Sequence, residues 1–387
     1  MNFGMNPFIH IDAEPVKRGT LTEVHISDIH FGVFDPKVQF DILSEQFLAK
    51  IAPLHFDVVS VDGDLFDHKF LSNSDAVMYA TKFVEALVWL CRGNGATLVL
   101  LHGTESHDAR QLKLFYHYLG TPGLDIRIVE TARFEDIKGM RVLCLPEEYG
   151  KGKAYYQRFL YGSGLYDTVF MHGNLKGGLF GANEEDLDAV KNPTFDINSF
   201  GLCTGPIIAG HVHIAGCFDK YMYYNGSPYR WNFGEEQPKG FMIILHNLDT
   251  GEHYAHFEEI TSFRYDTINL DNMVNSDPKQ VVEYIRQLQA SGIDNIRVEF
   301  TMGEAEWLEI IQNYYKNNPT IKIKADTASV REQAKQEIEF EEKYKQYEYI
   351  LDTSLSPQEI LCRYINQNKG YVYITAEELI KILEDET

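Results

Sequence analysis

Basic residues are scarce in this sequence. Its 387 residues include 35 Lys and Arg against 57 Asp and Glu, which gives a formal net charge of −22 at pH 7. Proteins that bind nucleic acid unaided usually carry a basic patch, because contacts to the phosphate backbone dominate the affinity. The charge balance therefore argues against DNA binding by this chain alone. It leaves open DNA binding in which metal ions or a partner subunit supply the positive charge.

Long apolar runs and paired cysteines are also missing. No stretch approaches the roughly 20 apolar residues that a membrane-spanning helix needs, and the first residues lack the basic and then apolar order of a signal peptide. The five cysteines are scattered, odd in number and without a CxxC pair. This usage indicates reduced thiols and a cytoplasmic protein, in the host cytoplasm if the chain is viral, rather than a disulfide framework or a thiolate zinc site.

A phosphate-binding loop of the GxxxxGK[ST] type is absent, so we do not expect this chain to be an ATPase. Apolar residues are plentiful: 44% of the chain is hydrophobic and 13% is aromatic, enough for a substantial core. Between residues 20 and 265, short apolar runs alternate with helical patterns, as they do in α/β domains. We expect helices at 35–52, 73–92 and 110–120.

Residue types at the helix ends strengthen two of these predictions. Asp35 and Pro36 suit the N-cap and first positions of the 35–52 helix. Gly93 and Gly95 suit the C-terminal end of the 73–92 helix. The runs between the helices, such as FDVVSV at 56–61, read as buried strands.

The character of the chain changes after residue 266. Helical and strand patterns in 266–329 suggest a small α+β module, with strands at 296–300 and 321–325 and a helix at 304–318. From residue 330 a charged helix extends to about 351. Two further helices follow, at 356–367 and 375–386, with Ser356 and Thr375 in N-cap positions.

Aspartate and histidine side chains follow several of the predicted strands. They lie in the short motifs SDIH, GDLFD, MHG and GHVH, and the residues are Asp28, His30, Asp64, His172, His211 and His213. Carboxylate oxygens mixed with imidazole nitrogens suit Mn²⁺, Fe²⁺ or Zn²⁺. Six such ligands exceed what one tetrahedral ion needs, so they predict two ions that share a carboxylate.

Each motif alone has an ordinary structural explanation. A histidine at the end of a strand is often satisfied by backbone carbonyls, and GDLFD by itself is compatible with a turn after a core strand. The prediction therefore rests on the whole set, in which each motif follows a predicted strand. His25, His68 and His102 lie beside the motifs but outside their pattern, so we expect structural or supporting roles for them.

These motifs resemble those of the calcineurin-like metallophosphoesterases, and within them the Mre11/SbcD family of DNA double-strand-break nucleases. The narrower resemblance rests on three runs after His213, namely NGSP at 225–228, FGEE at 233–236 and KGF at 239–241. It covers residues 20–265 motif by motif. Beyond them only the order of the segments matches. The acidic balance would suit a viral or divergent bacterial member.

The resemblance implies an α/β fold in which a metallophosphoesterase β-sandwich is flanked by helices, with a small α+β capping module and a C-terminal helical partner-binding element. Four segments follow from it: an N-terminal extension at 1–19, the nuclease domain at 20–265, the capping domain at 266–329, and a linker helix with a helical ATPase-binding region at 330–387.

The resemblance also implies a role for each matching residue. Asp28, His30 and His213 would hold one ion, His172 and His211 the other, with Asp64 between them. His107 would give a proton or hydrogen bond to the leaving 3′-oxygen, Asp108 would orient its ring, and a metal-bound water would be the nucleophile. Mn²⁺ is the expected metal, with Mg²⁺, Fe²⁺ and Zn²⁺ as alternatives.

One family motif, Gly-Asn-His-Asp, is altered here to GTESHD at 103–108. The family's Asn binds the second ion. Thr104 replaces it when the motif is counted from the Gly, and Ser106 replaces it when the motif is counted back from the His. We expect a hydroxyl or a water in its place. Because the other Asp and His residues are all present, a working site is favoured over an inactive one.

The resemblance further implies two protein partners. The family forms homodimers through the region of helices 35–52 and 73–92, and the second of these helices has more apolar residues than one core-facing stripe needs. These residues are Val77, Phe83, Val84, Leu87, Val88 and Leu90. The alternative is a helix that is buried on both sides.

The C-terminal helices at 356–367 and 375–386 predict the second partner. Their apolar faces suit docking on a Rad50/SbcC-like ATPase through 330–387, or packing against the capping module. The apolar residues are Ile360, Leu361, Tyr364 and Ile365 in the first helix, and Leu379, Ile380, Ile382 and Leu383 in the second.

The expected function is thus a metal-dependent DNA exonuclease and endonuclease subunit that acts on double-stranded ends and single strands in recombination and break repair. Two alternatives stay open: a small-molecule phosphodiesterase or phosphatase of the same fold, and a scaffold subunit with an impaired site. The fold alone does not choose among them.

Overall fold

The computed structural model describes residues 19–176, 194–269, 278–300, 320–325 and 355–368, apart from 163, 220 and 236, together with single residues between 313 and 318 and between 375 and 381. The described residues form two compact units that divide after Asp266, with Gly292–Asp294 belonging to the first unit. The boundary predicted from the sequence, between residues 265 and 266, lies one residue earlier. All the predicted metal ligands belong to the first unit.

One sheet of the first unit has the strand order β14-β13-β1-β2-β3-β4. Strands β1 to β4 run parallel, and β13 and β14 extend the sheet with antiparallel pairings. Its strands are β1 (Thr20–Ile26), β2 (Val58–Asp62), β3 (Thr97–Leu101), β4 (Asp125–Val129), β13 (Gly240–Asn247) and β14 (His253–Glu259).

The other large sheet has the order β11-β12-β10-β7-β6-β5. Its four central strands run parallel, and antiparallel strands form both edges. Its strands are β5 (Arg133–Ile137), β6 (Met140–Leu145), β7 (Thr168–His172), β10 (Ile207–Gly210), β11 (Gly216–Asp219) and β12 (Met222–Tyr224). A short parallel pair, β8 (Asn174–Lys176) and β9 (Thr194–Asp196), lies apart from it.

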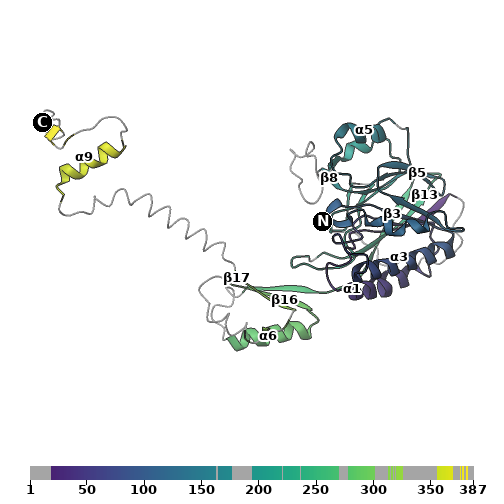
Figure 1. Ribbon diagram of the computed structural model, residues 1–387, viewed down its shortest axis with the longest axis horizontal. Helices are drawn as coiled ribbons and strands as arrows, with labels where there is room; N and C mark the ends of the chain where they lie inside the picture. The colour runs from purple at the N-terminus through teal and green to yellow at the C-terminus, as the bar shows by residue number, and fades with distance from the viewer. Residues whose placement is uncertain are drawn as a thin grey trace. The chain divides into compact units, whose positions relative to one another are not determined.

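Apolar side chains fill three layers of the first unit. Helices α1 (Pro36–Leu43) and α3 (Asp75–Asn94) lie side by side (Figure 1), and the core that they share with the first sheet includes Phe83 and Leu98. Residues of both sheets, such as Val99 and Phe170, form the middle layer. Helix α5 (Lys153–Leu160) packs on the second sheet. The unit is thus a two-sheet sandwich with outer helices, in agreement with the predicted α/β class.

The predicted 35–52 helix is built from three consecutive pieces: α1, a π-helical turn η1 (Ser44–Leu48) and α2 (Ala49–Ile51). Asp35 is the N-cap of α1, and its carboxylate accepts the Lys37 N–H at 2.8 Å. This hydrogen bond satisfies one of the N–H groups that the first helical turn leaves without a partner. The predicted N-cap is therefore confirmed.

Helix α3 follows Ser74 as N-cap and ends before Gly95, which adopts the left-handed conformation with φ 62°. Gly93 lies inside the helix. Five of its six apolar residues singled out above are buried in the core of the chain itself, and Leu90 packs partly against that core. The surplus of apolar surface is therefore used within the chain. On the outer face, Met78 is 42% and Trp89 is 70% exposed.

The segment predicted as an α-helix at 110–120 is instead a 3₁₀-helix, η2 (Gln111–Tyr118). Ala109 and Arg110 precede it with positive φ values of 44° and 58°. These left-handed residues separate η2 from the short α4 (Glu105–Asp108), so the chain does not continue from one helical segment into the next. Another single 3₁₀ turn, η4 (Ile197–Phe200), precedes β10.

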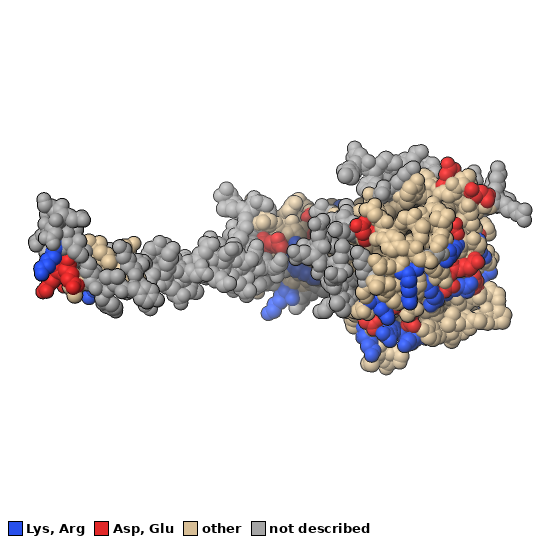
Figure 2. All heavy atoms as spheres, turned by 90° about the horizontal axis from the view of Figure 1, so that it is seen from above, with Lys and Arg blue, Asp and Glu red and all other residues tan. Residues whose placement is uncertain are grey.

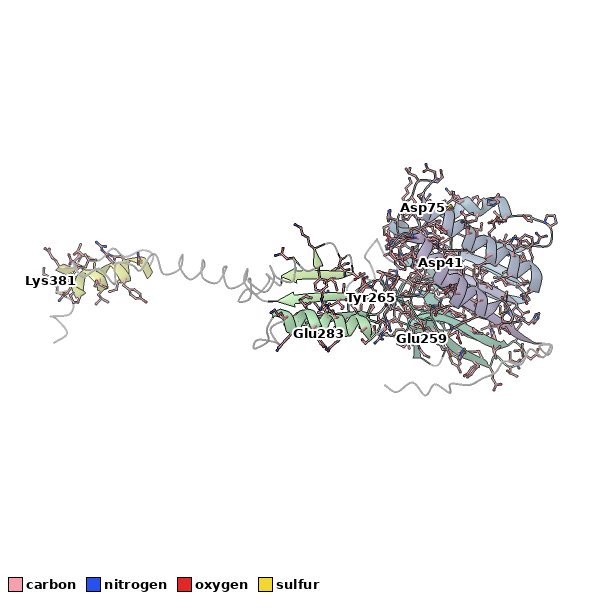
Figure 3. The ribbon with its side chains drawn as sticks, turned by 90° about the horizontal axis from the view of Figure 1, so that it is seen from below. Asp41, Asp75, Glu259, Tyr265, Glu283 and Lys381 are labelled. Atoms are coloured by element: carbon pink, nitrogen blue, oxygen red, sulfur yellow. The ribbon has the colours of Figure 1, made fainter. Side chains whose placement is uncertain are left out.

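A further three-stranded sheet consists of β15 (Tyr265–Asn269), β16 (Asn295–Phe300) and β17 (Ile321–Ala325), with β16 and β17 parallel. Apart from Tyr265 and Asp266, its residues belong to the second unit. Helix α6 (Pro278–Ala290) accompanies it; Figure 3 labels its Glu283. Helix α9 (Pro357–Asn368) begins with a reciprocal cap between Ser356 and Glu359. Most of the helix predicted at 304–318, the whole helix predicted at 330–351 and the apolar residues of the last helix lie outside the described residues.

Across the part of the chain that the structure describes, no helix has the length and apolarity required to cross a membrane.

Candidate metal centre

Loops at the carboxyl ends of four strands carry the six predicted ligands. Asp28 and Asp64 each lie two residues beyond a strand, β1 and β2, while His172 ends β7 and His211 follows β10. Strand ends of this kind are where α/β proteins gather functional side chains. The ligand atoms of Asp28, His30 and His213 lie within 4.8 Å of one another, and so do those of Asp28, Asp64 and His172.

The backbone at these loops is strained. Asp28, His30, Asp64 and His211 have positive φ values of 53°, 49°, 54° and 93°. Residues other than glycine seldom adopt this conformation, and where they do the strain often serves a site. Gly63 completes the close packing, because a Cβ atom there would lie 2.2 Å from Nδ1 of His172.

His30 and His213 are two of the three predicted ligands of the first ion. Within the described residues, neither ring nitrogen of His30 has a hydrogen-bond partner, although the residue is only 2% exposed. Burial lowers the pKa of His30 well below its ordinary value, and burial with the nearby Lys239 lowers the pKa of His213 to about 3. Both rings are therefore neutral at pH 7, the form in which imidazole binds metal.

Asp28 is held by its neighbours. Its carboxylate accepts the Ser27 hydroxyl at 2.6 Å and the His211 N–H at 3.0 and 3.1 Å. Burial raises the pKa of Asp28 to about 6; the attraction of His172 opposes this rise and the repulsion of Asp64 adds to it. A cation beside Asp28 would relieve both the burial and the repulsion.

Asp64 lies at the junction of the two ligand groups. Its Oδ2 atom is 3.7 Å from Nε2 of His30 and 3.2 Å from Nε2 of His172. Its Oδ1 atom accepts the Thr104 N–H at 2.6 Å, which fixes the carboxylate. This is the position that a bridging carboxylate needs.

His172 presents one defined nitrogen to the cluster. Its Nδ1 lies 2.8 Å from the carbonyl oxygen of Asp62, which can only accept, so Nδ1 carries a proton and Nε2 faces Asp64. Such a backbone contact commonly orients a metal-binding histidine. Burial would lower the pKa of His172, but Asp64 and the other nearby carboxylates raise it well above its ordinary value. A bound ion would take the place of that proton.

Glu147 joins the cluster although the sequence analysis did not single it out. It is 1% exposed, and its Oε2 atom lies 3.2 Å from Nδ1 of His211 and 3.9 Å from Nε2 of His172. Burial raises the pKa of Glu147, but hydrogen bonding from His211 and the charge of His172 outweigh burial and lower it overall. Glu147, His172 and His211 form a further group of three potential ligands.

The two residues proposed to replace the family's Asn differ in position. Thr104 is buried, and its hydroxyl lies 3.2 Å from Asp64, 3.0 Å from Glu147 and 3.4 Å from Nε2 of His172. Ser106 is exposed. The structure thus brings Thr104 to the cluster and leaves Ser106 outside it.

His107 and Asp108 do not form the expected pair. The His107 ring lies 4.6 Å from the His30 ring, and its Nδ1 contacts the carbonyl oxygen of Asp67. The Asp108 carboxylate instead accepts the N–H groups of Gly103 at 2.7 Å and of Phe66 at 3.1 Å, and a longer one from Asp64. The expectation that Asp108 orients His107 is corrected: Asp108 ties two ligand loops together.

The run at 225–241 stabilises the loop that carries His213. The Lys239 ammonium, 2% exposed, donates to the His213 carbonyl at 2.8 Å and to the Ser227 hydroxyl at 2.9 Å, and it pairs with Glu235 at 3.1 Å. Burial lowers the pKa of Lys239, and the Glu235 carboxylate limits this fall. The KGF and FGEE motifs therefore anchor the turn that carries His213.

Buried hydrogen bonds also hold the loop that carries His30. The Gln39 amide of α1 donates to the His30 carbonyl at 2.9 Å and to the Tyr229 hydroxyl at 2.6 Å. Tyr229 in turn contacts the carbonyl of Ile29. All these groups are buried. The Trp231 ring covers the same loops, with its centre 5.2 Å from the His30 ring and 4.7 Å from the His213 ring.

The three histidines outside the motif pattern have structural contacts. His25 is fully buried with Asp62 and Glu23. His102 lies 3.1 Å from Glu105 and 3.7 Å from Asp108. His68 is largely exposed and its ring stacks on Phe70.

The donor set fits two divalent ions. Carboxylate oxygens and imidazole nitrogens outnumber the ligands of a single ion, and they are the mixture that Mn²⁺, Fe²⁺ and Zn²⁺ accept. Among the described residues, both nitrogens of His30 and the Oε1 atom of Glu147 are buried without a hydrogen-bond partner. Buried polar atoms of this kind are costly unless something binds them.

No protein-family model and no curated protein matches this sequence. Solved structures align with it distantly. The cold-active protein-tyrosine phosphatase of the psychrophile Shewanella sp. is 14% identical with a TM-score of 0.28, and the alignment covers 61% of this chain and 80% of that chain. Another structure of a cold-active protein tyrosine phosphatase is 13% identical with a TM-score of 0.28, covering 61% of this chain and 78% of that chain. Likenesses at these TM-scores identify neither fold nor function.

Proposed function

We propose that this chain is a two-metal phosphodiesterase acting on DNA, a nuclease subunit similar to the Mre11/SbcD family. The observation that carries the proposal is the position of Asp64, whose Oδ2 atom lies 3.7 Å from one histidine ligand and 3.2 Å from another. Two divalent ions, with Mn²⁺ as the expected metal, would polarise the phosphodiester and stabilise charge on its attacking and leaving oxygens.

The chain's own residues would prepare this chemistry in two ways. The strained loops and the supports behind them hold Asp28, His30 and His213 in place without the substrate, which is the preorganisation that catalysis by charge stabilisation needs. His107 would act on the leaving oxygen. Because its Nδ1 donates to the Asp67 carbonyl, Nε2 is the nitrogen left to give a proton when the ring is charged.

The choice of DNA as substrate rests on the resemblance in the 225–241 run. The net charge of −22 and the mixture of basic and acidic side chains on the face in Figure 2 suit a chain that does not grip DNA alone. A Rad50/SbcC-like ATPase bound through 330–387 would supply much of that grip. A homodimer through helices 35–52 and 73–92 would use the outer face of α3, where Met78 and Trp89 are exposed.

The test is cleavage of end-labelled duplex and single-stranded DNA by the full chain, with Mn²⁺, Mg²⁺ or EDTA, and with or without the ATPase partner. We expect Mn²⁺-dependent cleavage by the wild type and none by Asp64→Asn, which removes the charge of the bridging position. Asp136→Asn, at an exposed position of the edge strand β5, is the matched control.

Two other results would redirect the assignment. Turnover of bis-p-nitrophenyl phosphate without any DNA cleavage would favour a small-molecule phosphodiesterase. Failure to cleave either substrate, with ATPase and ATP present, would favour a scaffold subunit.

A further inference from the structure

Glu147 lies in the metal cluster, but the family motifs assign it no role. It comes from the loop after β6, two residues beyond the end of the strand. Asp28 and Asp64 have the same offset from β1 and β2. The chain therefore directs three acidic side chains to one site from three strands.

The surroundings of Glu147 call for a cation. The side chain is fully buried, and its ion-pair partners within the described residues are the two histidines His172 and His211. Its Oε1 atom has no hydrogen-bond partner there. A buried carboxylate is costly unless a counter-charge and hydrogen bonds compensate for its lost hydration.

An ion pair with His211 alone does not account for this geometry. It would occupy Oε2 and leave Oε1 without a partner. It would also leave unexplained why Nε2 of His172, whose other nitrogen is fixed on the Asp62 carbonyl, lies 3.9 Å from the same carboxylate. A metal ion among these three side chains would bring them together, since each offers one ligand atom within 4.8 Å of the other two.

We infer that Glu147 is a carboxylate ligand of the second ion, in the place that an Asn holds in the family that this chain resembles. The inference deepens the proposed function and rests on it for the presence of two ions. Thr104 stands at the Asn position in the motif, and its hydroxyl lies 3.0 Å from Glu147 and 3.2 Å from Asp64. Thr104 is thus a positioning residue for the two carboxylates.

The substitution changes the charge of the site. A carboxylate in place of a neutral amide adds one negative charge, so Asp28, Asp64 and Glu147 together offset three of the four charges of two divalent ions. More carboxylate oxygen also favours harder ions such as Mn²⁺ and Mg²⁺ over Zn²⁺.

The test is Mn²⁺ binding to the full chain by isothermal titration calorimetry, with electron paramagnetic resonance to distinguish a coupled pair of ions from a single ion. We expect two ions in the wild type. In Glu147→Gln we expect the second ion to bind at least about tenfold more weakly, since even supporting groups of a metal site contribute that much. The matched control is Glu148→Gln, at the neighbouring glutamate. The Glu148 carboxylate accepts from the Ala132 N–H and the Tyr155 hydroxyl, both at 2.7 Å, and so makes its contacts outside the metal cluster.

Thermal unfolding in EDTA establishes that each variant folds. If Glu147→Gln does not fold, Glu147→Asp, which keeps the charge but is one methylene shorter, is expected to weaken the second ion in the same way. Unchanged binding of two ions by a folded Glu147 variant would overturn the inference, as would failure of the wild type to bind a second ion. Loss of the second ion in a chain whose wild type cleaves no phosphodiester would support the role of Glu147 and contradict the proposed function.

Discussion

The Nδ1 atom of His25 lies 2.9 Å from a carboxylate oxygen of Asp62, and both side chains are fully buried. On its other side, His25 lies 3.2 Å from Glu23. The Asn225 amide donates to Asp62 at 2.8 Å, and the Asp62 carbonyl accepts from His172. Asp62 therefore couples a buried ionic network to His172, one of the proposed metal ligands.

This network predicts a stability that depends on pH. Burial would lower the pKa of His25, but Asp62 and Glu23 raise it from 6.5 to about 9. The folded protein thus holds a proton that the unfolded chain releases, so this stabilisation is complete below pH 6.5 and is lost as pH rises through 9. Urea unfolding in EDTA should give a free energy of unfolding that falls by at most on the order of 3 kcal/mol between pH 6.5 and pH 10.

His25→Gln is the control for this prediction, because the amide donates to Asp62 but does not titrate. The difference in stability between wild type and variant should shrink as pH rises. Parallel curves for the two proteins would show that His25 is not charged in the folded state. At acid pH the stability depends on Glu23. Burial alone would raise the pKa of its carboxyl, yet in the folded protein this pKa is lowered from 4.5. The stabilisation by Glu23 is therefore lost as pH falls through its lowered pKa.

Thr104 and Ser106 are the two residues that could replace the family's Asn. We predict that substitution of Thr104 weakens Mn²⁺ binding and that substitution of Ser106 does not. Thr104→Val keeps the shape of the side chain and removes a hydroxyl within 3.0 to 3.4 Å of Glu147, Asp64 and His172. We expect Mn²⁺ affinity to fall by roughly tenfold, as for other supporting groups of metal sites. Ser106→Ala should bind Mn²⁺ like the wild type, and equal effects of the two substitutions would place the sensitive position elsewhere in the loop.

We predict that substitution of His107 lowers the rate of DNA cleavage without weakening Mn²⁺ binding. Removing a general acid typically lowers the rate by about 10²- to 10⁴-fold. His107→Ala should therefore lose kcat for DNA cleavage while the Mn²⁺ titration keeps two ions, and His68→Ala, on the exposed surface, should retain the wild-type rate. If His107→Ala instead lost an ion, His107 would be a metal ligand, as its closeness to His30 and Asp64 would allow.

From the contacts of Lys239 we predict that the 225–241 run stabilises the loop that carries His213. Lys239→Met removes the contacts to the His213 carbonyl, Ser227 and Glu235, and it leaves Glu235 without its partner. We expect the free energy of unfolding to fall by about 3 kcal/mol, with weaker binding of the first Mn²⁺ ion. Urea unfolding and calorimetry measure the two effects. A variant of wild-type stability would mean that the motif serves something other than this anchor.

The sequence predicted the order of strands and helices in the first unit better than their details. The predicted caps Asp35 and Ser356 were found because a side-chain oxygen next to free N–H groups is a local effect, visible in a short run. The left-handed conformation of Ala109 and Arg110, which separates α4 from Gln111–Tyr118, is not demanded by any residue type there. The burial of Val77 and Val88 depends on how α1 and the first sheet pack, a tertiary effect.

The site was predictable where a motif carried it. Asp28, His30 and Asp64 lie in short patterns after strands, and the structure brings them together. Glu147 has no motif, and it is one of 57 acidic residues. Its distance of two residues from the end of β6, the offset that Asp28 and Asp64 have from β1 and β2, was the feature that could have identified it. The contacts of Asp108 with backbone N–H groups were beyond prediction because they depend on how two loops meet.

The most direct test of this account is the anomalous X-ray scattering of crystals of the full chain grown or soaked with Mn²⁺. We predict two manganese peaks, one among Asp28, His30 and His213 and the other among His172, His211 and Glu147, with Asp64 in contact with both. A single peak, or peaks away from these residues at saturating Mn²⁺, would contradict the two-metal site on which the proposed nuclease rests.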